Sequence, residues 1–423
     1  MFRKGFFIFF CFIATNFLLS QTSLNMLHNL DLPIGGYKLD VDSSKTHFLQ
    51  IPFFDMDFEI YSNPNFSSFL FFKNGFLFDV DAYHNELNEF SDHFFYVNST
   101  LLHYMLKEKK TSYCIGITHD ASLDITFSKQ LVSLIVQGNS QFLNEEINLN
   151  TNSFRFHNYF SFYLGYGTKI SPDMELDFKI KFLKGGSLIE FENKGGSLVT
   201  ISQMNTFGNP FITTLNTHLN VVQNNSNSFF SNLGIATDFW LQKTYEDKFS
   251  VYGRISDLGF IRWSEEQYES NVNYDFDGLN YTLEQDLTEE FNVFTDTIKN
   301  HFLQESIVGH TLRVLPFSID IGLNYLLNGT DHQQIFCNYN FQKSFYEYLH
   351  TATLGYKIFF DQYNLSIIPM YSLNTLNYTN FSCFFSKNWN DKLIISLYSQ
   401  NLLGIVNPTF SHFNFGISLV SLF

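Results

Sequence analysis

The sequence has little proline and cysteine, and beyond its first twenty residues it has no long apolar run. Proline occurs 8 times in 423 residues and cysteine 4 times. Once Cys11 is set aside with the first twenty residues, Cys114, Cys337 and Cys383 remain, an odd number without a CxxC spacing, so neither a disulfide framework nor a zinc site is expected. No stretch of about 18 uncharged apolar residues follows residue 20, which excludes a further transmembrane helix.

Positive charge and catalytic motifs are also scarce. Lys and Arg number 25 against 41 Asp and Glu, for a net charge of −16, which argues against a nucleic-acid partner, because phosphates require a basic surface. The sequence contains no GxSxG, HExxH, P-loop or GxGxxG motif, and its 13 His form no spaced cluster with Cys or carboxylates. We therefore predict no catalytic, cofactor-binding or metal-binding residue and no enzymatic activity.

The first twenty residues have the pattern of a secretory signal peptide. Arg3 and Lys4 precede the apolar run at 5–19, and Ser20 is a small residue suited to a cleavage site. The alternative is an uncleaved anchor, but the run is short for a membrane span. We expect export, removal of residues 1–20 and a single mature domain at 21–423.

What the sequence has in excess is aromatic residues placed in alternation. Phe occurs 53 times and Tyr 23 times, yet the mean hydropathy is near zero, so apolar residues are interleaved with polar ones. Period-two alternation recurs at 318–326 and 351–359 and is clearest at 175–184. Successive strand residues point to opposite faces, so each such segment has one apolar and one polar face. In 175–184 the polar face carries Glu175, Asp177, Lys179 and Lys181.

Two environments produce this alternation. One is a secreted soluble β-sandwich that acts as a binding module, and the other is a membrane barrel with apolar side chains facing lipid. Segments of about ten residues match tilted bilayer-spanning strands, and links such as 388–392 are short. Aromatics often stand near segment ends, as in interfacial girdles. We predict an all-β protein, a transmembrane antiparallel up-and-down β-barrel of roughly 12–14 strands, with short helices in loops such as 128–143. A barrel hydrolase is a further alternative, but no nucleophile and base arrangement is visible.

Two groups of residues are candidates for function inside or above such a barrel. Glu175, Asp177, Lys179 and Lys181 are predicted to face the lumen, because charge is costly in lipid. Residues 264–306 form an acidic insertion with eleven carboxylates and one Lys. A predicted helix there places Phe291, Phe294 and Ile298 on one stripe, which makes the segment a candidate docking or plug element.

Two further segments carry specific expectations. The repeat at 184–193 and 194–203 begins twice with Lys-Gly-Gly-Ser, and its Gly-Gly pairs predict a hairpin. Residues 411–423 alternate and end on Phe423, as expected for a last strand that pairs with the first to close a barrel.

Several segments share one pattern, among them "LGYGTKISPDMELDFKIKFLKG" (164–185), "DLGFIRW" (257–263) and "LPFSIDIGLNYLLN" (315–328). Together they resemble a Bacteroidota outer-membrane family catalogued as domain of unknown function 5723, which is similar to FadL-like and PorV-like barrels. The early part of the chain departs from the family's pattern, with "HNLDLPIGG" in place of an "NPA"-type motif. The resemblance implies localisation in the bacterial outer membrane, contact with outer-membrane lipid, and either transport of a solute or partnership with proteins of a surface or secretion assembly, without catalytic residues. The segments that carry it are 138–143, 164–185, 250–263, 274–281, 315–328 and 400–408, of which "DLGFIRW" (257–263) is the most specific.

Overall fold

A computed structural model gives the fold of most of the chain. It describes residues 45–50, 55–63, 70–71, 77–78, 84–85, 87–108, 110–137, 139–150, 152–202, 211–224, 228, 230–246, 248–276, 306–327, 333–343, 348–375, 380–389, 392–400 and 412–422. The predicted signal peptide lies outside these residues.

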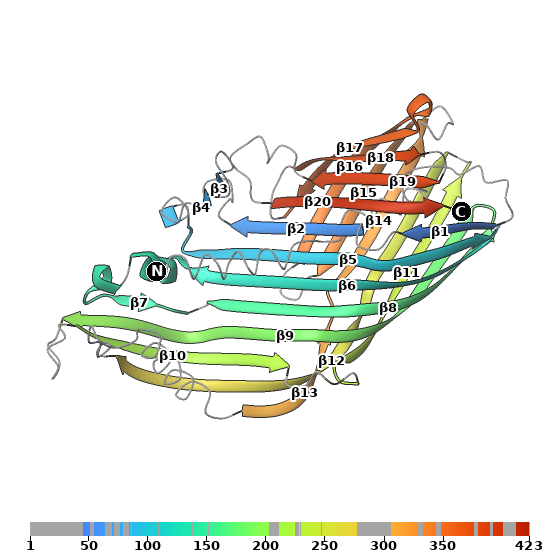
Figure 1. The fold of residues 1–423 in the computed structure, drawn as a ribbon. Coiled ribbons are helices and arrows are strands. Elements are labelled where there is room, and N and C mark those ends of the chain that lie inside the picture. Colours follow the sequence, from blue (N-terminus) through green and yellow to red (C-terminus); the bar gives the residue numbers. More distant parts are fainter. Residues whose placement is uncertain are drawn as a thin grey trace.

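The strands form one antiparallel sheet that closes on itself (Figure 1). Strand β20 (His412–Leu422) pairs with β19 (Leu393–Gln400) on one edge and with β1 (Lys45–Gln50) and β2 (Asp55–Asn63) on the other. The free edge of β1 and β2 then pairs with β5 (Phe90–Glu108), which completes the ring. The predicted all-β antiparallel barrel is therefore confirmed, and the alternative of a two-sheet sandwich is wrong.

Among the described residues the ring has fourteen strand positions. Four positions are each occupied by two strands that follow one another along the same line: β1 with β2, β7 with β8, β10 with β11, and β13 with β14. The small sheet of β3 and β4 and the helix α4 lie outside the ring. The remaining elements are β3 (Leu70–Phe71), β4 (Leu77–Phe78), β6 (Thr111–Ser128), α4 (Lys129–Gln137), β7 (Glu146–Asn148), β8 (Ser153–Ser171), β9 (Met174–Ser202), β10 (Phe211–Asn224), β11 (Leu233–Tyr245), β12 (Phe249–Phe276), β13 (Ser306–Val314), β14 (Phe317–Leu326), β15 (Gln333–Lys343), β16 (Tyr348–Phe360), β17 (Leu365–Asn374) and β18 (Asn380–Trp389), with 3-10 helices at Asn139–Phe142 and Asp361–Tyr363.

The two ends of the barrel differ. At one end, the short-turn end, neighbouring strands are joined by tight links such as 172–173 and 390–392. At the other, the loop end, the connections include 64–89 and 277–305. The strands from β5 to β13 form a tall wall, with 29 residues in β9 and 28 in β12, whereas β14 to β20 form a low wall of strands of 8 to 13 residues. The tall wall extends far beyond the low wall at the loop end (Figure 1).

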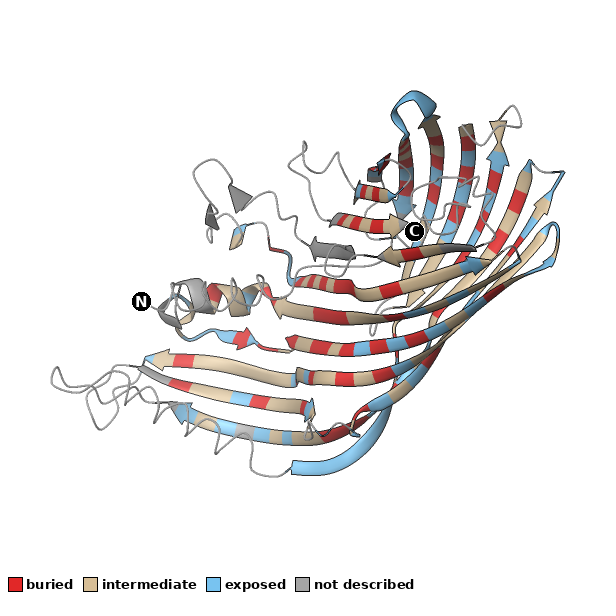
Figure 2. Cartoon of the chain, turned by 45° about the vertical axis from the view of Figure 1, so that its right-hand side comes forward, coloured by how far each residue is buried: buried red, intermediate tan, exposed pale blue. Residues whose placement is uncertain are grey.

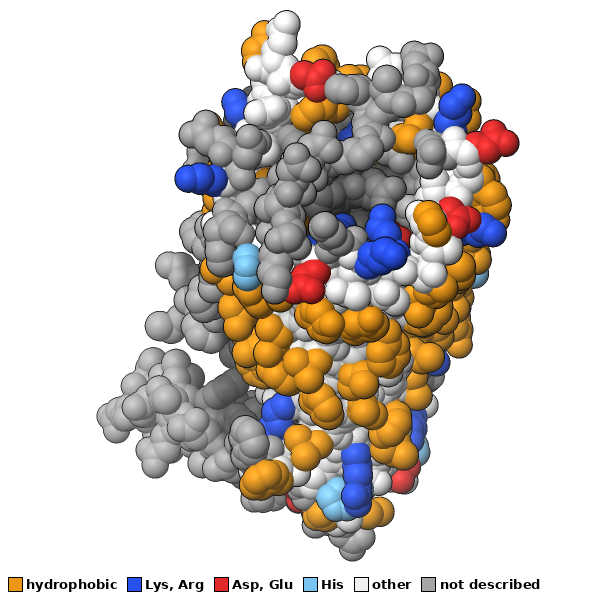
Figure 3. Space-filling view, turned by 90° about the vertical axis from the view of Figure 1, so that its right-hand side faces the viewer, with side chains coloured by type: hydrophobic (Ala, Val, Ile, Leu, Met, Phe, Trp, Pro, Cys, Tyr) orange, Lys and Arg blue, Asp and Glu red, His pale blue; other side chains and the backbone are white. Residues whose placement is uncertain are grey.

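Burial alternates along the strands (Figure 2), and many of the exposed positions carry large apolar side chains. On β8, Phe162 and Leu164 are 41% and 47% exposed, while Ser161 and Tyr163 at the alternate positions are 1% and 6% exposed. The same alternation continues from β6 to β19, so the exposed apolar side chains form a belt, part of which is visible in Figure 3. We call it the outer belt; its members include Phe182, Ile235, Leu258, Ile321, Leu354, Phe385 and Leu397.

Aromatic side chains border the outer belt at both ends. Lysine ammonium groups lie over two of these rings at the short-turn end, with Lys243 5.0 Å from the centroid of Tyr245 and Lys387 4.9 Å from that of Trp389. This is the composition of an interfacial girdle, where aromatic and cationic groups meet lipid headgroups. The short-turn border includes Tyr113, Tyr166, Tyr245, Tyr325, Phe360 and Trp389, and the loop-end border Phe160, Phe260, Tyr348, Tyr371 and Phe381.

On the inner face, large aromatic rings lie flat over glycines of neighbouring strands. A Cβ added at Gly322 would overlap the ring of Tyr252, and one at Gly355 would overlap Phe336. Glycine in a strand often marks such a close approach, because the missing side chain leaves room for the ring. Gly116 and Tyr163 form another such pair, and Trp263 on β12 lies in the same way against Gly185 of β9, which is not its neighbour in the sheet.

Two sequence expectations differ from the structure. The repeat at 184–203 is not a hairpin but the continuous second half of β9. Its glycines serve close packing, since a Cβ at Gly185 would strike Trp263 and one at Gly196 would strike the backbone carbonyl oxygen of Asn216. The acidic insertion begins later than residue 264, because 264–276 continue β12. That part of the tall wall is polar on both faces, so no alternation revealed the strand.

The ring-over-glycine contacts make a prediction about stability. Gly355→Ala should lower the free energy of unfolding by about 1–3 kcal/mol, because Phe336 is only 1% exposed and has little room to move away from the new methyl group. Gly253→Ala is the matched control, since a Cβ there meets nothing within 4 Å. Denaturant unfolding in detergent or lipid measures both; equal stability of the two variants would contradict the packing.

Candidate functional site

The inner face of the tall wall holds a buried ionic cluster around Lys181, which we call the Lys181 cluster. The Nζ atom of Lys181 on β9 lies 2.8 Å from Oδ1 of Asp238 on β11 and 2.6 Å from Oδ1 of Asp257 on β12. Their side chains are 13%, 10% and 21% exposed. Two carboxylates thus share one ammonium inside the barrel wall.

A local irregularity in β12 brings Asp257 into this cluster. Its φ is 60°, in the left-handed region, and the β11–β12 register shifts opposite it between Thr237 and Phe239. The backbone N–H of Asp257 donates to Oδ1 of Asp238 at 2.9 Å. Asp is among the few non-glycine residues that visit this conformation without a large cost. The bulge redirects Asp257, the first residue of "DLGFIRW", toward Lys181, which gives that motif a structural role.

A second acidic group continues the polar inner face on β5 and β6. Asp120 is 5% exposed, and its Oδ1 accepts hydrogen bonds from the Asn98 amide at 2.6 Å and from the Tyr96 hydroxyl at 2.9 Å. A buried carboxylate needs such donors, because removing its hydration without them is costly. The polar groups facing inward therefore extend over much of the tall wall.

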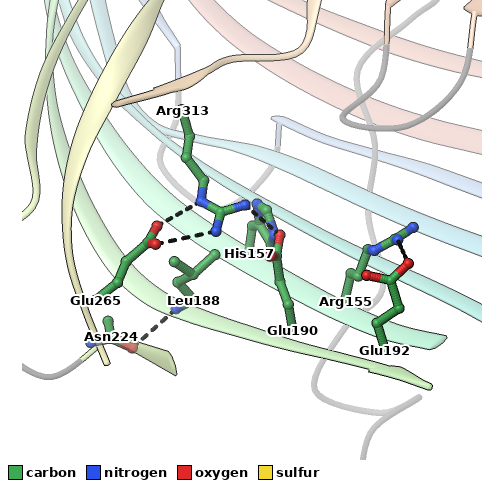
Figure 4. Close-up of polar contacts among 8 residues, drawn as sticks. All are labelled: Arg155, His157, Leu188, Glu190, Glu192, Asn224, Glu265 and Arg313. Atoms are coloured by element: carbon green, nitrogen blue, oxygen red, sulfur yellow. Dashed lines mark hydrogen bonds and ion pairs between the residues drawn. The ribbon is translucent and has the colours of Figure 1, made fainter. Parts of the chain in front are cut away.

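Nearer the loop end, Arg313 ties the last strand of the tall wall to strands further along it (Figure 4). Its Nε and Nη2 donate to the two carboxylate oxygens of Glu265 at 2.6 and 3.3 Å, and its Nη1 donates to Oε1 of Glu190 at 2.8 Å. Glu190 also contacts Nε2 of His157 at 3.0 Å. Because β13 and β9 are not neighbours in the sheet, these bonds cross its inner face.

The far end of the tall wall is more exposed and still acidic. Glu269 has a side chain that is 52% exposed and lies 3.0 Å from Nε2 of His218. The hydrogen bond from His218, helped by the Lys194 charge, lowers the pKa of Glu269 below its usual value. This carboxylate therefore stays ionised at neutral pH, in keeping with a water-facing rim.

The four predicted lumen-facing residues lie on one face of β9. Lys181 joins the Lys181 cluster, Lys179 lies 5.3 Å from the ring centroid of the buried Tyr163, and Glu175 pairs with Lys169 at 2.7 Å. A Cβ at Gly167 would overlap the carboxylate of Asp177. The alternate positions Phe178 and Phe182 are exposed in the outer belt, so the contacts agree with the alternation, and the lumen-facing assignment stays a prediction.

The candidate docking or plug residues Phe291, Phe294 and Ile298 lie outside the described residues. Sequence reasoning missed the partners of Lys181, namely Asp238 and Asp257, because pairing across strands depends on register. It missed Arg313 for the same reason. The one available signal was the placement of Asp257 at the start of the specific "DLGFIRW" segment.

Within the described part of the chain, no helix is long and apolar enough to cross a membrane. Those residues also contain no group of three or more His, Cys, Asp or Glu side chains placed to hold a metal ion.

Because Lys181 is shared by two carboxylates, its substitution should lower the stability of the barrel far more than substitution of a lysine in an exposed ion pair. Lys181→Met should destabilise the barrel by about 3–5 kcal/mol, because it leaves Asp238 and Asp257 buried without their shared cation. Lys169→Met removes a partner of Glu175 from a pair whose lysine is 42% exposed, and should cost at most about 1 kcal/mol. Unfolding midpoints of the two variants give the comparison. Similar losses for both would show that the Lys181 cluster does not hold the wall together.

Comparison with known proteins gives one family match. The model described as "Family of unknown function (DUF5723)" matches residues 41–405. No curated protein matches the chain.

Solved structures give distant likenesses. The Pseudomonas putida toluene transporter TodX is 10% identical with a TM-score of 0.44 and covers 90% of this chain and 89% of its own. The Ralstonia pickettii toluene transporter TbuX is 8% identical with a TM-score of 0.45, covering 90% and 88%. A Pseudomonas aeruginosa FadL homologue is 8% identical with a TM-score of 0.41, covering 90% of each chain.

Proposed function

Because this chain belongs to the family of unknown function DUF5723, as its sequence predicted, and that description names no activity, we propose a function from the barrel itself. The protein is an integral outer-membrane β-barrel without enzymatic activity, and it passes a solute through its interior. The observation that carries the proposal is the outer belt on a closed ring. Large apolar side chains are exposed on the outside of the closed ring from β6 to β19, and exposed apolar surface of this extent requires a lipid surrounding.

The dimensions and ends of the barrel support a membrane position. On β12 the outer belt runs from the short-turn border to Phe260, and Arg262 follows on the same face. Twelve residues of a strand tilted by about 40° span about 25–30 Å, which matches the hydrocarbon thickness of an outer membrane. Short turns face the periplasm in such barrels and long loops face outside, so the tall wall would stand outside the cell.

A polar inner face supports passage over a purely structural role. The Lys181 cluster, Asp120 and the low-wall serines all point away from the outer belt. Ser366, Ser386, Ser396 and Ser418 occupy one row across four adjacent strands, and each is at most 1% exposed. Phe384, Ile394 and Val420 lie two residues from these serines on the same face and are at most 1% exposed, so the inner face of the low wall combines small polar with large apolar side chains. Export through a cleaved signal peptide at 1–20 belongs to the same proposal.

Fractionation and a pair of substitutions test the membrane position. The protein should remain with outer membranes after carbonate extraction, and unboiled and boiled samples should migrate differently on SDS gels. Ile180→Arg should cost about 2–4 kcal/mol if Ile180 faces lipid near the midplane, whereas Lys179→Arg should be close to neutral. Recovery of soluble protein without detergent, or the reverse order of the two variants, would refute the lipid-facing assignment.

Strand β13 favours a second role, as a partner in a surface assembly. Among the described residues it pairs only with β12, and Ile307, Val308 and Leu312 are 71%, 63% and 63% exposed. An open apolar edge is a template for one more strand. We propose that a β-strand of another outer-membrane or secretion-assembly protein pairs with β13.

A photo-crosslinker at Val308 should therefore capture a partner in intact cells, and Leu312→Lys should abolish that capture. The same crosslinker at Phe230, which is 81% exposed but lies outside the strands, is the control. Equal capture at both positions would argue against a specific edge.

A further inference from the structure

Three buried polar side chains on the inner face of the barrel have atoms without a hydrogen-bond partner among the described residues, and strand register places these side chains near one another. The atoms are the hydroxyl of Tyr252 on β12, both amide atoms of Asn324 on β14, and the amide oxygen of Asn338 on β15. Their residues are only 1%, 2% and 2% exposed. Most buried polar atoms in proteins have a partner, so a local group of exceptions calls for a physical explanation.

Strand register brings the three together over Gly322. Tyr252 and Asn338 lie directly across from Gly322 on the two flanking strands, and Asn324 is two residues further along the same face of β14. The Tyr252 ring and its hydroxyl lie against the space that a Cβ of Gly322 would occupy. The glycine therefore lets the phenol cross toward Asn338, and three unpartnered groups share one small area, which we call the Gly322 site.

The cost of leaving these atoms unpaired is substantial. A buried donor or acceptor without a partner costs about 1–3 kcal/mol, and Asn324 alone has two such atoms. The neighbouring carboxamide shows the usual solution, since Asn340 Nδ2 donates to Asp320 Oδ1 at 2.7 Å. An apolar residue of similar size would avoid the cost at position 324. A residue that stays polar without a protein partner is suited to a partner from outside the chain.

We propose that the Gly322 site binds an uncharged, hydroxyl-rich solute, such as a sugar, on its way through the barrel. The inference rests on the proposed function and adds the class of solute. Each sugar hydroxyl both donates and accepts, so it can satisfy the amide oxygens, the amide N–H groups and the phenol together. A hydrocarbon would leave all of these atoms unpaired. An ion would find no full opposite charge within the three groups themselves.

Charges of both signs flank the Gly322 site, so small zwitterions belong among the solutes compared. Asp320 lies two residues from Gly322 on β14, and Arg254 on β12 pairs in register with Asp320, two residues from Tyr252. Asp320 is buried, at 4% exposed, and Arg254 is half-buried. A zwitterion could exploit this pair of charges, whereas a sugar depends on the amides and the phenol. Substituting Tyr252, Asn324 or Asn338 therefore distinguishes binding of a sugar from binding of a zwitterion.

Equilibrium binding to the purified full-length protein in detergent tests the site. Glucose, maltose and glycerol are the probes, with glycine and toluene for comparison. At least one of the sugars should bind, Asn324→Leu and Asn338→Leu should each weaken its binding at least tenfold, and Tyr252→Phe should weaken it several-fold. Ser396→Ala is the matched control, because Ser396 faces inward, away from Gly322 in the ring, and is hydrogen-bonded to Ser386 at 3.1 Å. Heat-modified migration on gels confirms that each variant folds.

The outcomes separate the site from passage itself. If neither glucose nor maltose binds, or if glycine or toluene binds with the same dependence on Asn324, the inference is overturned. Swelling of liposomes that contain the protein measures flux independently. Sugar binding with no flux of any solute would refute passage and support the site, whereas sugar flux unchanged in all three variants would support passage and overturn the site.

Discussion

The structure depends on pairing the backbone N–H and C=O groups of every strand that lies in the membrane. In hydrocarbon an unpaired N–H or C=O group cannot form a hydrogen bond with water, so a sheet can lie there only if its first and last strands pair with each other. Here β20 meets β1 and β2, and these in turn meet β5, at positions far apart in the sequence. Once the ring is closed, the alternation of side chains assigns each residue to one of two faces, and the outer belt and the polar inner face follow together.

Glycines adapt that ring to large inner side chains. Where Tyr163, Tyr252 and Phe336 lie along the wall, the neighbouring strand has glycine beneath the ring, and Trp263 covers Gly185 of β9, a strand that is not its neighbour in the sheet. The aromatic side chain then covers backbone instead of projecting across the barrel. Burial of the ring compensates for the weakness of glycine in a strand. The same arrangement creates the Gly322 site, because a side chain at 322 would hold the Tyr252 hydroxyl away from Asn338.

The sequence was most informative where a strand has one apolar and one polar face. The segments at 318–326 and 351–359 alternate clearly and are strands, and the helix expected within 128–143 is present as α4. The Lys-Gly-Gly-Ser repeat led to the wrong prediction of a hairpin, because glycine occurs both in turns and where another group packs closely against a strand. Only the position of Trp263 and of the neighbouring backbone decides between the two. Residues 264–276 were not recognised as strand, because water on both faces removes the alternation.

The inner clusters were the least predictable feature. The alternation of side chains predicts that Lys181 faces inward, but its ion pairs with Asp238 and Asp257 depend on the register of three strands and on one bulge. Arg313 reaches Glu190 across strands that are not neighbours, a contact that no local pattern encodes. Charged residues on inward positions can be found from sequence, whereas their partners require the fold.

The unequal height of the two walls determines the direction from which molecules can enter. A cylinder cut obliquely has a wider aperture than one cut straight across, and the opening looks sideways over its shorter side. Considering only the described strands, the barrel opens on the side of the shorter strands β14 to β20, so its aperture faces along the cell surface instead of away from it. Diffusing molecules would then arrive mainly from one sector of the membrane plane. The orientation of the barrel relative to its neighbours would therefore affect its supply of solute.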